Sequence, residues 1–363
     1  MLGGYPPFSS RRNIHFFFSL FLLASLYCLV LLGVGGRLNF SSGRSSVSWN
    51  PGAIFFSSPV GNSSQVSERY KLDNVLRDAA MKDGTVILTT LNEAWAAPGS
   101  VIDLFLESFR IGDGTHRLLK HLVIVALDMK AFSRCISAHT HCFLLTTEGV
   151  DFSSEAYFMT SDYLKMMWRR IDFLRSVLEM GYNFVFTDAD VMWFRDPFTQ
   201  FFVDTDLQIA CDNFLGDSED IDNKPNGGFN YVRSNNRSIQ FYKFWYSSRE
   251  TFPGYHDQDV FNFIKYNPFI TEIDLKIRFL DTQYFGGLCE PSKDLNRVCT
   301  MHVNCCFGLK SKLHDLRIIL QDWKFYLSMP TTLKRSLIMS WSVPQNCSLD
   351  SLSQYGVPLN STQ

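Results

Sequence analysis

The sequence predicts an α/β fold in which a mainly parallel, mixed sheet carries helices on both faces. Continuous apolar runs such as 86–91 and 122–127 are typical of strands buried on both sides, because a strand with one wet face alternates apolar and polar residues. These runs alternate with longer segments of helical periodicity, as parallel strands and their crossover helices do. With 46% hydrophobic residues, the chain can fill one sizeable core.

The elements follow from local patterns in chain order. The expected strands are 86–91, 122–127, 142–145, 184–186, 207–211, a strand entered through a glycine turn within 224–233, 276–280 and 298–303. The expected helices are 68–81, 101–109, 130–139, 164–180, 239–249, one opened by the polar cluster 256–264, and 313–327. Ser100 caps one helix and Gly181 ends another, whereas 92–99 is expected to be a loop. No repeat or linker interrupts this region, so we expect one domain.

The amino-terminal region predicts a membrane anchor. Arg11 and Arg12 precede an uncharged apolar segment, 14–34, which is long enough for a bilayer span of about 20 residues. A cleavable signal peptide would have a shorter apolar core of about 7–15 residues, so an anchor is favoured over cleavage. The positive charges beside a short tail favour a cytoplasmic amino terminus. The expected domains are a tail 1–13, an anchor 14–34, a flexible stem 35–67, a lumenal domain 68–330 and a carboxy-terminal extension 331–363.

Two further features agree with a lumenal body. Sequons for asparagine glycosylation begin at Asn39, Asn62, Asn236, Asn346 and Asn360. In an oxidising lumen Cys135 can pair with Cys142, and pairs are also possible among Cys289, Cys299, Cys305 and Cys306, with the connectivity left open. The formal net charge of -2 gives no indication of a nucleic-acid partner.

Two carboxylates mark the end of a buried strand. Asp188 and Asp190 follow the apolar run 184–186, and they point the same way if the strand continues that far. Converging carboxylates are costly unless a cation neutralises them, and oxygen ligands favour Mg²⁺ or Mn²⁺, which also take phosphate oxygens. Asn92 and Asp128 follow other strands, so the same rim of the sheet should hold them.

Four motifs in order resemble a known family. They are Asp188-Ala189-Asp190, 226–230, 257–262 and 302–304. The set resembles nucleotide-sugar glycosyltransferases of the GT-A fold, and more narrowly the plant nucleotide-diphospho-sugar transferase domain of glycosyltransferase family 77, from about residue 84 to residue 327. The resemblance implies a retaining, metal-dependent transfer from a UDP-sugar to a cell-wall polysaccharide or glycoprotein. It also implies a type II Golgi membrane protein that can form complexes with itself or with other glycosyltransferases.

The resemblance also implies roles for single residues. Mn²⁺ or Mg²⁺ would be held by Asp188, Asp190 and His302, and catalysis would involve Asp257 and Gln258. The donor would be bound by Asp188, Asn92, Asn226, Gly227, Gly228, Asn230 and Lys310. Lys310 departs from the family pattern, since related enzymes have a tighter His-x-x-Gly-x-x-Lys spacing than His302, Gly308 and Lys310 provide.

Plainer interpretations remain beside these. His302 can be a core histidine, Asp257 can serve a helix amino terminus, Gly227-Gly228 can be a turn, and the aromatic run 241–246 is expected in the core. Aspartate-nucleophile phosphatases also begin with Asp-x-Asp, but they need a lysine between their acidic motifs and none lies between Asp190 and Gly216. A glycosyltransferase-like lumenal protein that binds sugar without turnover is the remaining alternative.

Overall fold

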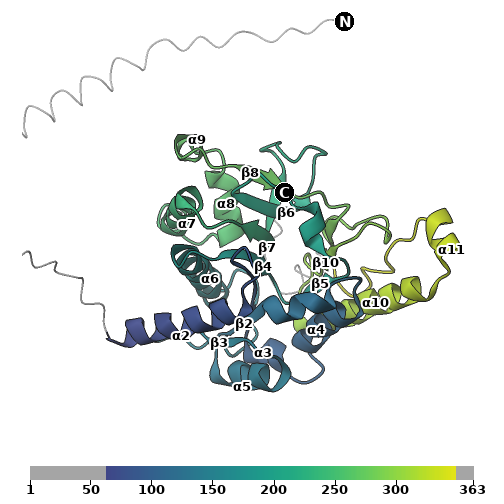
Figure 1. The fold of residues 1–363 in the computed structure, drawn as a ribbon, viewed down its shortest axis with the longest axis horizontal. Coiled ribbons are helices and arrows are strands. Elements are labelled where there is room, and N and C mark those ends of the chain that lie inside the picture. The colour runs from purple at the N-terminus through teal and green to yellow at the C-terminus, as the bar shows by residue number, and fades with distance from the viewer. Residues whose placement is uncertain (1–62, 349–363) are drawn as a thin grey trace, which may run out of the picture. The chain divides into compact units, whose positions relative to one another are not determined.

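A computed structural model describes residues 63–348 of the protein (Figure 1). The expected tail and anchor, most of the expected stem and residues 349–363 lie outside the described residues. None of the helices in the described part combines the length and the apolarity that a membrane span needs.

The centre of the fold is a seven-stranded sheet with the order β3-β2-β1-β4-β7-β6-β8. Its strands are β1 (Thr85–Leu91), β2 (Leu122–Ala126), β3 (Cys142–Leu144), β4 (Asn183–Thr187), β6 (Leu207–Asn213), β7 (Lys224–Val232) and β8 (Ile277–Phe279). The pairs of β1 with β2 and β4, β2 with β3 and β6 with β8 are parallel, whereas β7 runs antiparallel to β4 and β6. The predicted mainly parallel, mixed sheet is confirmed.

Helices cover both faces of this sheet (Figure 1). One face packs on α2 (Ser63–Ala79), α6 (Ser161–Glu179), α7 (Asn236–Ser248) and α8 (Asp257–Ile264). The other packs on α4 (Val101–Ile111), α5 (Met129–Ala138) and α10 (Leu309–Ser328). Within β1, Val86 and Leu88 belong to the first core and Ile87 to the second, so the strand is buried on both faces as its apolar run predicts.

Several short elements were not expected. They are α3 (Glu93–Ala96) inside the predicted loop, α9 (Pro268–Glu272), α11 (Thr331–Ser336), two 3₁₀ helices (His116–His121 and Pro197–Gln200), β5 (Val191–Trp193) and β9 (Phe285–Gly287). β5 and β9 flank β10 (Thr300–His302) in a second sheet of three strands. The expected turn at Gly227-Gly228 is wrong, because both residues lie inside β7, where the pairing with β6 shifts register after Ile209.

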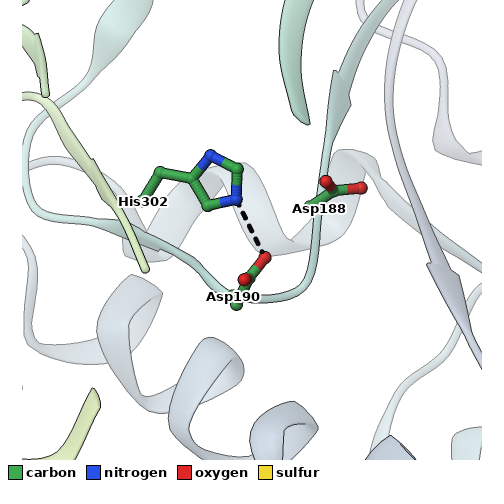
Figure 2. A group of neighbouring side chains, drawn as sticks. All are labelled: Asp188, Asp190 and His302. Carbon is green, nitrogen blue, oxygen red and sulfur yellow. Dashed lines mark ion pairs between the residues drawn. The ribbon is translucent and has the colours of Figure 1, made fainter. Parts of the chain in front are cut away.

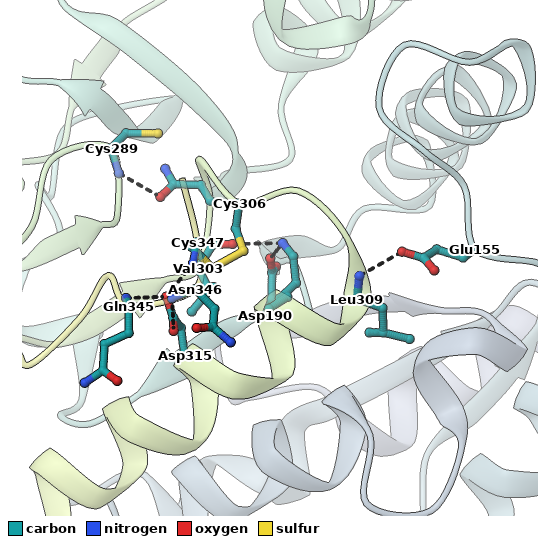
Figure 3. The surroundings of a disulfide bond; sticks show 12 residues. Glu155, Asp190, Cys289, Val303, Cys306, Leu309, Asp315, Gln345, Asn346 and Cys347 are labelled. Carbon is teal, nitrogen blue, oxygen red and sulfur yellow. Dashed lines mark hydrogen bonds and ion pairs between the residues drawn. A yellow bond between two sulfur atoms is a disulfide. The ribbon is translucent and has the colours of Figure 1, made fainter. Parts of the chain in front are cut away.

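Disulfides tie the later part of the chain together. The predicted pair Cys135–Cys142 is present, and the others in the described part are Cys289–Cys305 and Cys306–Cys347, while Cys299 is a buried free thiol. Cys347 lies beyond the expected domain end at 330, yet its neighbourhood is firmly held (Figure 3). The Asp315 carboxylate accepts hydrogen bonds from the backbone N–H groups of residues 345–347, each at 3.0 Å. Residues 341–347 therefore pack as part of the domain, with Trp341 buried 5.3 Å from the Phe194 ring.

Candidate active site

A tight turn places the two carboxylates of the acidic motif. β4 ends at Thr187, and Val191 N donates to Asp188 O at 3.1 Å as β5 begins. The strand thus does not continue through the motif, and the turn, rather than strand alternation, brings Asp188 and Asp190 together. β10 pairs with β5 so that His302 stands opposite Val191. As a result Asp188, Asp190 and His302 each offer one ligand atom within 4.8 Å of the others (Figure 2).

This donor set fits a divalent cation. Asp190 is buried, and its Oδ1 has no hydrogen-bond partner among the described residues, although His302 Nε2 lies 3.2 Å away. A buried carboxylate oxygen without a hydrogen bond is costly, because it has lost its water without replacement. A hard cation bound by two carboxylates and an imidazole would satisfy that oxygen.

Lys312 forms an ion pair with the same carboxylate. Its Nζ donates to Asp190 Oδ2 and, at 2.8 Å, to Val303 O. Burial alone would raise the pKa of Asp190, but Lys312 and His302 outweigh it and hold that pKa below its ordinary value. Burial would lower the pKa of His302, and the neighbouring carboxylates raise it instead. Asp190 is therefore ionised and ready to accept a cation.

The expected lysine, Lys310, is exposed, and the structure brings Lys312 to the cluster instead. On α10 the buried positions include Asp315, Leu316 and Ile319, and Lys312 lies one helical turn before them on the same face. Residues two apart on a helix point to nearly opposite sides, which turns Lys310 away from that face. Counting helical turns back from the buried positions of α10 would have identified Lys312 as the lysine on the buried face. A donor-binding role for Lys310 stays a prediction.

A buried arginine joins the acidic motif to the predicted catalytic pair. Arg170 Nη1 donates to Asp188 Oδ1 at 2.9 Å, and its Nη2 donates to Asp257 Oδ2 at 2.5 Å. Burial would raise the pKa of Asp257, yet Arg170 and His256 lower it to about 2. Sequence reasoning missed Arg170, although it occupies a position on the apolar stripe of α6 between Met167 and Leu174. A charge on a buried stripe indicates a buried partner.

His256 stands between two carboxylates at the start of α8. Nδ1 lies 3.5 Å from Asp257 Oδ1, and Nε2 lies 3.3 Å from Asp259 Oδ2. Nδ1 also lies 3.3 Å from Gln258 N, and only a neutral ring could accept a hydrogen bond from that N–H group. The two neighbouring carboxylates favour the charged ring instead. Although burial opposes the charge, the carboxylates raise the pKa of His256 to about 9.

We expect stability to depend on pH through His256. Its pKa in the folded protein, about 9, exceeds the ordinary value of 6.5, so its contribution is complete below pH 6.5 and is lost as the pH rises through 9. The free energy of unfolding, measured by urea titration, should therefore fall between these pH values. His256→Gln should flatten this dependence, and an equal fall in that variant would assign the dependence to other groups.

Asp212 organises the amide side chains of the site. It accepts hydrogen bonds from Asn226 at 2.8 Å, Asn304 at 2.7 Å and Gln258 at 2.8 Å, and Gln258 Oε1 in turn accepts from Gly227 N at 3.0 Å. Burial raises the pKa of Asp212 above its ordinary value, although these hydrogen bonds act to lower that pKa. The predicted residues Asn226, Gly227 and Gln258 are thus brought together, by an aspartate that the sequence did not single out.

Other residues singled out from the sequence form hydrogen bonds to the backbone or pack in the core. The Asn92 side chain caps α3 by accepting from Trp95 N and donates to Phe152 O and Ser154 O. Asn230 is buried and donates to Gly227 O at 3.3 Å. The aromatic run of α7 supplies buried core residues, as expected: Phe241, Tyr242 and Trp245. Donor-binding roles for Asn92 and Asn230 stay predictions.

Gly228 allows β7 to approach the carboxylates closely. A Cβ there would lie 2.5 Å from His302 Cε1 and 2.7 Å from Asp188 Oδ2, so Gly228→Ala must displace the cluster. We expect this variant to lose metal affinity, measured by Mn²⁺ titration, and to lose about 1–3 kcal/mol of stability. Gly227→Ala is the matched control, because its Cβ would meet atoms no closer than 3.5 Å. Equal metal affinity in the two variants would contradict the prediction.

Comparisons with known proteins agree with this arrangement. A sequence model described as nucleotide-diphospho-sugar transferase matches residues 117–316. The uncharacterised Arabidopsis thaliana protein At4g15970 is 51% identical over 278 residues, which cover 76% of this chain and 73% of that protein. At1g28695, also an uncharacterised protein of Arabidopsis thaliana, is 39% identical over 275 residues, which cover 74% and 80%. UDP-D-xylose:L-fucose alpha-1,3-D-xylosyltransferase 3 of the same plant is 25% identical over 224 residues, which cover 59% and 55%.

Proposed function

Because the chain belongs to the nucleotide-diphospho-sugar transferase family, we propose that this glycosyltransferase uses a divalent cation to move a sugar from a UDP-sugar to a glycan. The observation that carries the metal dependence is the group of Asp188, Asp190 and His302, with the unsatisfied buried oxygen of Asp190. Three relatives are named for UDP-D-xylose and another for UDP-galactose, so a UDP-pentose or UDP-hexose is the donor that we propose. The acceptor is a cell-wall polysaccharide or a glycoprotein.

Each residue of the site has a role in the reaction that follows from its chemistry. Asp188, Asp190 and His302 would hold Mn²⁺ or Mg²⁺, which supplies positive charge to the diphosphate leaving group. Lys312 adds a fixed ammonium group to the same end of the site. Asp257 is ionised and held by Arg170, so it can stabilise the positive charge that develops at the anomeric carbon. Gln258 is fixed by Asp212 and Gly227, which suits it to orient a sugar hydroxyl.

We also propose the setting that the amino terminus indicates. The segment 14–34 would anchor the protein in the Golgi membrane with the domain in the lumen. The disulfides of the described domain support a compartment that is oxidising.

Donor turnover by the purified protein tests this function. It is incubated with a panel of UDP-sugars in Mn²⁺, in Mg²⁺ and in EDTA, with and without oligosaccharide acceptors. We expect hydrolysis or transfer of one donor, restored after EDTA by either cation, and a retained anomeric configuration in the product by NMR. Failure to bind or turn over every donor in the panel would refute the proposal, and full activity in EDTA would refute its metal dependence.

A further inference from the structure

Asp212, near the end of β6, accepts hydrogen bonds from amide side chains on β7, on α8 and just after β10. Its Oδ1 accepts from Asn226 Nδ2 at 2.8 Å and from Asn304 Nδ2 at 2.7 Å. Its Oδ2 accepts from Gln258 Nε2 at 2.8 Å. Three donors around one carboxyl group favour its ionised form, which can only accept. All three amides must therefore turn their N–H2 groups toward Asp212 and their carbonyl oxygens away from it.

One of these carbonyl oxygens connects Asp212 to the backbone of a metal ligand. Asn226 Oδ1 accepts from Gly228 N at 2.9 Å. Gly228 O in turn accepts from Asp188 N at 2.7 Å. A series of hydrogen bonds thus runs from Asp212 through β7 to Asp188, which follows β4 in the seven-stranded sheet.

A second carbonyl oxygen connects Asp212 to the strand that carries the other metal ligand. Asn304 follows His302 by two residues, and its Oδ1 accepts from Cys289 N at 3.2 Å. Gly287 of β9 pairs with His302, and a Cβ on Gly287 would lie 2.5 Å from Asn304 Oδ1. The Asn304 amide therefore fastens the end of β10 to the segment after β9 on one side and to Asp212 on the other.

We propose that Asp212 is a positioning residue that sets the spacing between the metal ligands Asp188 and His302. The amides of Asn226 and Asn304 bond to one and the same oxygen, Oδ1, so the two series of hydrogen bonds meet at a single atom. A divalent cation binds tightly only when its ligand atoms lie within about 0.2 Å of their usual distances. The cation in this cluster rests on the proposed function, whereas the hydrogen bonds that hold its ligands do not.

The alternative is that Asp212 acts only through its charge, because a carboxylate near a cation site also attracts the cation. The two roles differ in what they predict for Asn304→Ala. This substitution leaves every charge in place and removes the amide that connects Asp212 to the end of β10. A charge effect predicts unchanged cation binding in Asn304→Ala, whereas a positioning role predicts a loss.

Cation binding can be measured without turnover, by titration calorimetry of the purified full-length protein with Mn²⁺. Asp212→Asn puts an N–H2 group where an amide already donates, so at least one hydrogen bond must break. We expect the Mn²⁺ affinity to fall about tenfold, which corresponds to about 1.4 kcal/mol, the size of one hydrogen bond. Asn304→Ala should lower it by a similar factor. The electron paramagnetic resonance spectrum of bound Mn²⁺ should change in both variants, because its splitting reports how the ligands surround the ion.

Moving the carboxylate across the hydrogen bond should rescue Mn²⁺ binding. In Asp212→Asn/Gln258→Glu the amide at position 212 can donate to the new carboxylate, which still accepts from Gly227 N. The oxygen shared by Asn226 and Asn304 is unchanged. We expect the Mn²⁺ affinity to return to within about threefold of the unaltered value, since the two substitutions are in direct contact and compensate each other. Gln258 is assigned to catalysis, so the rescue is measured as Mn²⁺ affinity and not as sugar transfer.

Asp206→Asn is the structural control. Asp206 is buried just before β6, about 20 Å along the strand from Asp212, and it also accepts from an amide, that of Asn235, at 2.8 Å. This variant should have a lower free energy of unfolding in urea and an unchanged Mn²⁺ affinity and spectrum. A purely structural role for Asp212 would give the same result in Asp212→Asn and would overturn the proposal.

The remaining outcomes are also decisive. Normal Mn²⁺ affinity in Asn304→Ala would assign the effect of Asp212 to its charge and overturn the positioning role, and this variant decides the matter if Asp212→Asn does not fold. A double variant that binds no better than Asp212→Asn would also count against it. An unaltered protein that binds no Mn²⁺ would overturn both this proposal and the metal dependence of the proposed function. Mn²⁺ binding that depends on Asp212 and Asn304, in a protein that turns over no UDP-sugar, would support the positioning role and count against the proposed function.

Discussion

Asp190→Asn is expected to reduce sugar transfer by about 10³-fold, because a cation ligand and leaving-group stabiliser together account for several kcal/mol of transition-state stabilisation. Asparagine keeps the shape of the side chain and can still accept from Lys312, but it cannot offer a charged oxygen to a cation. Mn²⁺ affinity, followed by calorimetry, should fall with the activity. A variant that binds Mn²⁺ normally would show that the cation is held elsewhere.

The matched control is Asp196→Asn in the same segment of the chain. Asp196 pairs with Arg117, whose side chain is 63% exposed, and caps the 3₁₀ helix after it through Phe198 N. Asparagine can keep that cap, and an exposed ion pair contributes only about 0–1 kcal/mol. We therefore expect near-normal transfer from this variant. Similar losses in both would mean that the Asp190 effect comes from a general disturbance of this segment rather than from the cation site.

Arg170→Met is expected to destabilise the fold by about 3–5 kcal/mol and to abolish activity, because it leaves Oδ2 of the buried Asp257 without the guanidinium that donates to it and removes the same guanidinium from Asp188. The free energy of unfolding from urea titration and the melting temperature measure this effect. Arg170→Lys should recover part of the stability, since an ammonium group keeps the charge but cannot bridge both carboxylates as the planar guanidinium does.

Arg117→Met provides the comparison for a surface arginine. Its partner is Asp196, so the loss should be within about 1 kcal/mol. If Arg170→Met destabilised the fold as little as this control does, the arginine bridge between Asp188 and Asp257 would not contribute to stability. Activity measurements on Arg170→Lys then separate stability from catalysis. If this variant is folded but slow, the role of Arg170 is to orient Asp257.

The sequence predicted the fold where patterns were long and continuous. The run at 86–91 could be assigned because its residues favour a strand buried on both faces and are too few for a core helix, and it corresponds to β1. β5 and β9 were missed because three residues carry no measurable period. The glycines of β7 were misassigned to a turn because local sequence does not reveal a register shift against β6.

The candidate site was predictable only where motif order constrained it. Asp188, Asp190 and His302 were selected together, and the structure brings them together. Arg170 and Lys312 were missed because their functional signal is a position on a buried helix face rather than a motif. Tertiary contacts define such residues, and only the helical period could have indicated them.

The Cys306–Cys347 bond and the Asp315 carboxylate have a consequence for the order of biosynthesis. A chain is made and delivered from its amino terminus, so β1 to β4 emerge long before residue 347 does. His302 and Lys312 lie on either side of Cys306, and the segment that fastens Cys306 is made after both of them. The segment that carries His302 and Lys312 is thus fastened only after residue 347 has been made and an oxidant has closed the Cys306–Cys347 bond.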